Sequence, residues 1–174
     1  MVDVWTFFFR HKLLLSMLIA LGYVAIFRQQ CIVLFLLTLL NAGAVYWRTR
    51  YNFPVDFTPT VFGLVIVAGG GIAHVLFYVF FGVILPTVIT GILSPDAIVF
   101  WGSLAVLGGV AWVLHSLPFG ILAIGITVSV LKVVFSLGWR AVAGAPLFQA
   151  ITNEILNLLL NIFLLYRFGV RFSV

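Results

Sequence analysis

Long runs of residues without a charged side chain dominate this sequence. Four uncharged runs, and a fifth that contains only Glu154, occupy residues 13–27, 31–47, 57–94, 97–131 and 141–166. Only 7% of the residues are charged and 64% are hydrophobic, so a soluble fold of this size would expose much apolar surface to water. The sequence therefore predicts an all-α protein, a polytopic transmembrane helical bundle whose solvent is the bilayer.

The two longest runs must each contain more than one helix, because a membrane-spanning helix needs about 20 residues. Pro118 lacks an amide donor and disfavours a helical conformation in the preceding residue. It divides its run into predicted helices over 97–114 and 119–137, joined as a tight hairpin.

The run over 57–94 contains two prolines and the triplet Gly69-Gly70-Gly71. We expect a short helix over 59–68, a glycine turn, and a longer helix over 72–90. Irregular backbone at membrane depth needs protein or an aqueous cavity to satisfy it, which puts the glycines inside the bundle or at its mouth. Close helix packing is the other interpretation of the triplet.

These divisions give a single integral membrane domain over residues 1–174, with about six spans and one short glycine-interrupted segment. Seven spans is the alternative count. Basic residues suggest the orientation, because cytoplasmic loops are rich in Lys and Arg. Four of them (Arg10, Lys12, Arg48, Arg50) fall on one side of the first spans and Arg28 on the other, which predicts a multi-pass protein of the cell membrane with a cytoplasmic N-terminus.

Glu154 is the most informative ionisable residue, because a charge at the membrane midplane costs about 2.5 to 3.5 kcal/mol on insertion scales. Gln149, Asn153, Asn157 and Asn161 follow one another at spacings of four, and these offsets place the amides and the carboxylate on one side of a helix. The stripe could line a cavity for a substrate or an ion, with Glu154 as the charge. It could equally be a set of interhelical hydrogen bonds that hold the bundle together.

Of three further charged residues, Lys132 and Asp56 have two interpretations each. Lys132 could pair with Glu154, but we expect it to extend its side chain to the nearby interface instead. Asp56 could cap the helix that follows it, or it could be a cavity-facing carboxylate paired with a nearby arginine. Asp96, after Ser94-Pro95, is expected to be a cap or turn residue.

No motif in the chain indicates an autonomous enzyme, a metal site or a cofactor. His74 and His115 lie in different segments without a second ligand at helical spacing, so we expect hydrogen-bonded histidines in the bundle rather than a metal centre. A membrane-embedded enzyme remains a third hypothesis, and it requires that at least two of Asp56, His74 and Glu154 face a shared cavity.

The arrangement from about residue 13 to 168 resembles two related families of membrane proteins. Its features are the short Pro-bounded segment Phe53-Pro54-Val55-Asp56-Phe57-Thr58-Pro59, the glycines that follow, and a helix ending near Pro86 and Gly91. They resemble the substrate-binding (S) components of energy-coupling-factor transporters and the MreD-like proteins of rod-shape determination. The first resemblance implies a ligand cavity near the outer face and docking on a transmembrane coupling subunit with ATPases. The second implies a role in membrane assemblies without a ligand pocket.

The predicted function is a non-catalytic membrane subunit, a small-molecule binding component of an uptake transporter. Its cavity would be built from the glycine-interrupted segment and the last helix, with substrate-binding residues Asp56, Gly70, Asn153, Glu154, Asn157 and Asn161. A structural or assembly protein of the cell envelope is the alternative. The expected partners are the lipid bilayer and a coupling subunit or other membrane proteins, without nucleic acid.

Overall fold

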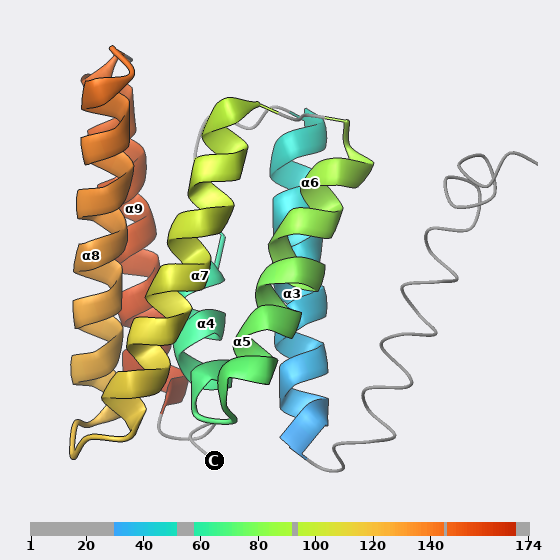
Figure 1. Cartoon of the computed structure of the whole chain (residues 1–174), viewed down its shortest axis with the longest axis vertical. Helices are drawn as coiled ribbons and strands as arrows, with labels where there is room; N and C mark the ends of the chain where they lie inside the picture. Colours follow the sequence, from blue (N-terminus) through green and yellow to red (C-terminus); the bar gives the residue numbers. More distant parts are fainter. Residues whose placement is uncertain (1–29, 52–57, 92–93, 145, 170–174) are drawn as a thin grey trace, which may run out of the picture.

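The computed structural model of the protein describes residues 30–51, 58–91, 94–144 and 146–169, and every regular element in these ranges is helical. Four long helical rods and a fifth more polar one run along the bundle, and a short helix lies among them (Figure 1). The elements are α3 (Gln30–Tyr51), α4 (Thr60–Ala68), α5 (Ile72–Val79), the π-helical η1 (Phe80–Ile84), α6 (Leu85–Ile89), α7 (Pro95–His115), α8 (Ile121–Val142), α9 (Leu147–Leu164) and the π-helical η2 (Leu165–Gly169).

Four of these rods are long and apolar enough to cross a membrane. They are 32–51 of α3, the continuous stretch 72–89 of α5, η1 and α6, and the whole of α7 and α8. The rod α9 is 18 residues long and carries the polar stripe. The all-helical prediction is confirmed for the described residues, and so are the predicted breaks between 68 and 72 and after His115.

The two ends of the bundle differ in character. Arg48, Arg50 and Arg140 lie in the last turns of α3 and α8, and we call this the basic end; it is uppermost in Figure 1. The turns at 69–71 and 116–120 lie at the opposite end, which we call the glycine end (Figure 1). Gly71 has φ of +106°, a conformation that glycine adopts without steric cost, so the chain can reverse there between α4 and α5.

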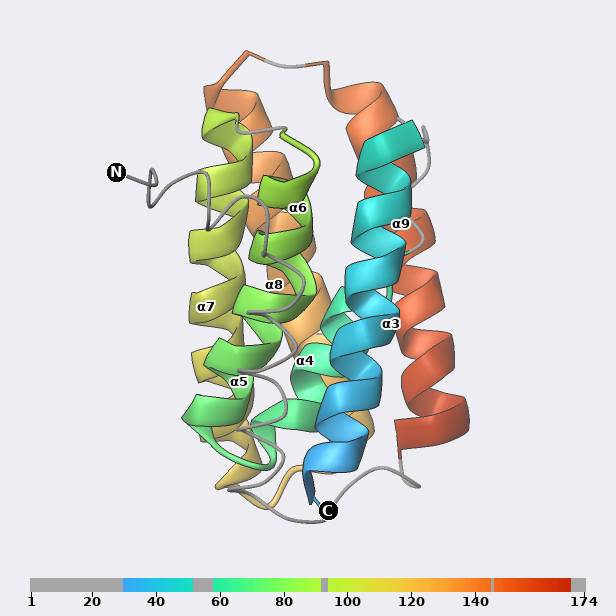
Figure 2. The ribbon, with the colours of Figure 1, turned by 90° about the vertical axis from the view of Figure 1, so that its right-hand side faces the viewer.

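The short helix α4 fills the interior of one half of the bundle. All nine of its residues are buried, and it contacts α3, α5, α7, α8 and α9. Figure 2 shows α4 in the half nearer the glycine end. The half nearer the basic end has no comparable central helix among the described residues.

A proline explains the irregular turn in the rod that α5, η1 and α6 form. Pro86 has no amide proton to donate to the carbonyl of Gly82 four residues earlier, and the π-helical turn η1 lies at this point. The Gly82 carbonyl instead accepts a 2.9 Å hydrogen bond from Nδ2 of Asn41 on α3. The Gly82 carbonyl and the Asn41 amide thereby satisfy each other, and the rod that α5, η1 and α6 form is fixed to α3.

Candidate binding cavity

A cavity of about 640 Å³ occupies the half of the bundle that α4 does not fill. Its walls come from α3, η1, α6, α7 and α8, with Glu154 contributed by α9. A volume of this size lies within the range of ordinary small-molecule sites, about 300 to 1,000 Å³. The cavity is therefore large enough for a metabolite rather than for a few water molecules only.

The floor of the cavity is the first turn of α4. Thr58 and Thr60 line it, although Thr60 also donates a 3.0 Å hydrogen bond to Oδ1 of Asn41. Amide groups in a first helical turn lack partners within the helix, and the helix dipole makes this end positive. A helix that begins inside a bundle thus presents a polar, electropositive floor.

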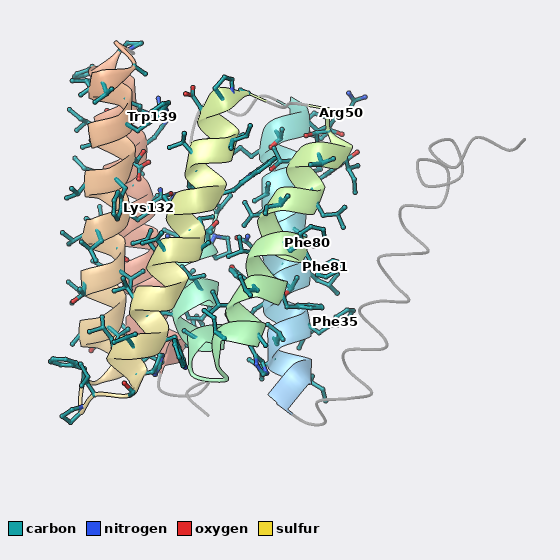
Figure 3. The ribbon with its side chains drawn as sticks, viewed as in Figure 1. Phe35, Arg50, Phe80, Phe81, Lys132 and Trp139 are labelled. Atoms are coloured by element: carbon teal, nitrogen blue, oxygen red, sulfur yellow. The ribbon has the colours of Figure 1, made fainter. Side chains whose placement is uncertain are left out.

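An ion pair forms one wall at mid-height. Nζ of Lys132 lies 2.5 Å from Oε2 of Glu154, and Ser136 donates a 2.7 Å hydrogen bond to Oε1 of the same carboxylate. All three residues line the cavity, and Lys132 lies about halfway along α8 (Figure 3). The expectation that Lys132 extends to the interface is wrong, because it is 5% exposed and its charge is compensated inside the bundle.

The mouth of the cavity is polar and aromatic. Arg48, Arg140, Asp96 and Trp139 line it, and Nε1 of Trp139 donates a 2.9 Å hydrogen bond to Asp96. Figure 3 shows the Trp139 side chain extending from α8 toward α7 near the basic end. Asp96 lies in the first turn of α7 but does not cap it, since Oγ of Ser94 accepts the 3.2 Å hydrogen bond from the amide of Ala97.

The predicted stripe on α9 divides into two parts. Glu154 lines the cavity, whereas Asn157 and Asn161 are buried beside the start of α4 and are not among the lining residues. Oδ1 of Asn161 accepts a 2.7 Å hydrogen bond from the amide of Phe62, and its Nδ2 lies 2.6 Å from Oδ1 of Asn157. Asn161 therefore caps α4, and Asn157 holds the Asn161 side chain in place.

The remaining predicted site residues lie elsewhere. Asn153 is half-buried on α9 and does not line the cavity. Gly70 lies in the turn at the glycine end, next to His74. Asp56 lies outside the described residues. Nothing in the structure brings Gly70 and Glu154 into one site.

The sequence reasoning missed three hydroxyl side chains that line the cavity: Thr58, Thr60 and Ser136. Hydroxyl side chains in apolar helices give a weak signal, because they can satisfy themselves on the backbone of the preceding turn. Ser136 had one available indication: it follows Lys132 by four residues, which places the two side chains on the same face of α8.

His74 and His115 lie in separate places, and neither lines the cavity. His115 lies 2.8 Å through Nε2 from the carbonyl oxygen of Val65. His74 is buried and lines a small hollow of about 50 Å³ with Gly69 and Gly70. His74 and Glu154 thus face different hollows, which removes one of the pairs that the enzyme hypothesis requires. No group of three potential metal-ligating side chains occurs within the described ranges.

Together these features define a class: an all-helical bundle with four helices suited to crossing a membrane and a cavity that is lined on one wall by a buried ion pair. No protein-family profile, curated protein or solved structure matches this chain. The function is therefore argued from the cavity and its surroundings.

Proposed function

We propose that this protein is a small-molecule binding subunit of an uptake transporter and that the ligand occupies the cavity above α4. The observation that carries the proposal is that α4 begins inside the bundle, which leaves a cavity of about 640 Å³ beside a buried Lys132–Glu154 pair. Buried polar groups around an empty space are costly unless water or a ligand contacts them. A protein with a purely structural role has no need of that arrangement.

The proposed topology has six spans and one short, half-length crossing. The four apolar rods supply four spans, and α9 with η2 supplies a fifth, since α9 packs along α8 over 18 residues, about 27 Å at 1.5 Å per residue. The run over 13–27 is the proposed first span. The segment that contains α4 completes a further, half-length crossing.

The proposed orientation puts the basic end in the cytoplasm. Arg48, Arg50 and Arg140 lie at that end, and Arg167 lies at the other, at the end of the last rod. The positive-inside rule then gives a cytoplasmic N-terminus and places the cavity in the cytoplasmic half of the membrane. The resemblance to the S components implies a cavity near the outer face instead, so the proposed orientation departs from that resemblance.

A gentle extraction tests this proposal against its main alternative. The full chain is purified from its own membrane in a mild detergent, and native mass spectrometry reads both retained small molecules and stoichiometric partner proteins. A retained polar molecule together with an ATPase-linked partner is the expected result. Recovery with cell-envelope proteins and with an empty cavity would contradict it.

That alternative, a structural or assembly protein, has one observation in its favour. The side chains of Asn41, Asn157 and Asn161 are all engaged in hydrogen bonds within the bundle. They hold helices together, as asparagines commonly do in membranes. This accounts for the floor but leaves the cavity and its Lys132–Glu154 pair without a purpose.

A further inference from the structure

One face of α8 changes from buried to exposed along the helix. Ile124 and Val128 are 1% and 0% exposed, whereas Phe135, Trp139 and Val142 are 47%, 36% and 83% exposed. Successive members are separated by four, seven, four and three residues, so all five lie on one side of the helix. This side packs against neighbours near the glycine end and loses them near the basic end.

The neighbouring helix α7 shows the complementary change. Leu104, Leu107 and Ala111 are fully buried, whereas Ala97 and Phe100, on the same face nearer the start of the helix, are half-buried. Because α7 and α8 are joined by the turn at 116–120 and run in opposite directions, their more exposed halves lie at the same level. Figure 1 shows the two helices diverging toward the basic end.

The divergence opens the cavity sideways. Phe135, Trp139 and Val142 line the cavity as well as being exposed, and Phe100 lines it from α7. A ligand can therefore enter between α7 and α8, on the flank of the bundle, as well as from the basic end. In a membrane protein that flank faces lipid.

The charges at this opening favour an anion. Lys132 is compensated by Glu154, and the other charged residues that line the cavity are two arginines, Arg48 and Arg140, and one carboxylate, Asp96. Arg140 lines the cavity near the opening and has no hydrogen-bond or ion-pair partner among the described residues. Its guanidinium group, in the last turn of α8, is at the level where lipid headgroups are expected.

We propose that the ligand is an anionic amphiphile that enters from the lipid phase through the opening between α7 and α8. Its anionic group binds Arg140, and its apolar part lies against Phe100, Phe135 and Val142. This inference rests on the proposed function, since it names the chemical class of the ligand for the same cavity. It goes beyond the proposed function because it requires a lateral entrance to the cavity and an anionic group on the ligand.

Lipid exchange in defined nanodiscs tests the proposal. The full chain is reconstituted in phosphatidylcholine with a small fraction of phosphatidylglycerol of identical acyl chains, and the lipids that remain bound after extraction are counted by native mass spectrometry. Phosphatidylglycerol should be enriched on the wild-type protein. Arg140→Gln should reduce the enrichment roughly tenfold or more, because a charge-assisted contact contributes about 1.5 to 3 kcal/mol.

Arg167→Gln is the matched control, since Arg167 is an exposed arginine at the opposite end of the bundle. It should leave the enrichment unchanged. A photoreactive residue at position 135 should crosslink phosphatidylglycerol, and the same residue in place of exposed Phe163 should not show selectivity over phosphatidylcholine.

Three outcomes would overturn this inference alone. They are equal retention of both lipids, equal loss with either arginine variant, and preferential binding of water-soluble glycerol phosphate over the lipid. In the last case the cavity still binds a small anion, so the proposed function survives while the lateral entrance fails. An empty cavity in every condition would remove both.

Discussion

Oδ1 of Asn161 accepts a 2.7 Å hydrogen bond from the amide of Phe62, a residue 99 positions earlier in the chain. The first turn of a helix has amide groups without internal partners, and a helix that starts inside a bundle has little water to satisfy them. Asn161 supplies this partner from α9. It therefore makes an interior start for α4 possible, and with it the cavity above.

Removal of this cap should destabilise the bundle. Asn161→Leu leaves the amide of Phe62 buried without its acceptor, and the expected loss is about 1 to 3 kcal/mol of unfolding free energy. Asn153→Leu is the matched control, because Asn153 is half-buried about two helical turns before Asn161 on α9 and has no interhelical hydrogen bond among the described residues. Thermal unfolding in detergent measures both, and equal shifts would argue against the capping role.

The Lys132–Glu154 pair should behave as a coupled unit. Lys132→Met leaves a buried carboxylate without its counter-charge, and loss of one partner from a buried pair typically costs about 3 to 5 kcal/mol. The double variant Lys132→Met/Glu154→Gln should recover most of that loss. A double-mutant cycle on thermal stability measures the coupling, and additive effects would show that the pair does not interact in the membrane.

Two adjacent glycines on α7 should respond in opposite ways to alanine. A Cβ atom at Gly108 would overlap Cγ1 of Val75 and lie 3.2 Å from Cδ1 of Leu64, whereas one at Gly109 would meet no atom within 4 Å. Gly108→Ala should therefore cost about 1 to 3 kcal/mol. Gly109→Ala should be neutral or slightly stabilising, because alanine favours the helix. Unfolding midpoints in one detergent make the comparison, and similar losses would contradict the packing of α7 on α4 and α5.

The proposed orientation can be read by thiol labelling. In a Cys31→Ser background, Thr49→Cys places a thiol in the cavity near the basic end, and Gly69→Cys places one in the turn at the glycine end, where an added Cβ atom meets no atom closer than 3.5 Å. An impermeant maleimide should label Gly69→Cys on intact cells and Thr49→Cys only after the membrane is permeabilised. The reverse pattern would place the cavity on the outer side, as the S-component resemblance implies.

The positions of the helices followed from local signals in the sequence. Pro118 and the Gly69–Gly71 triplet interrupt long apolar runs, and the structure breaks its helices at both places. Such residues act through their own backbone geometry, so their effect needs no knowledge of the neighbouring helices.

The partners of the polar residues did not follow in the same way. The spacing of Glu154, Asn157 and Asn161 predicted a common face, but the spacing alone does not show that Glu154 faces a cavity while the asparagines meet α4. That division depends on the depth at which α4 begins, which is a tertiary property. Lys132 was misjudged for the same reason: its pairing depends on how α8 and α9 align, and either alternative is compatible with its position in the sequence.

The most direct test of the central claim fills the cavity from a position that tolerates a larger side chain. Gly138 lines the cavity and Gly102 does not, and a Cβ atom at either would meet nothing within 4 Å. Native mass spectrometry of gently extracted protein should show a small molecule bound to the wild type and to Gly102→Leu, and its loss from Gly138→Leu. Identical retention by all three proteins, or no retained molecule in any of them, would contradict the account.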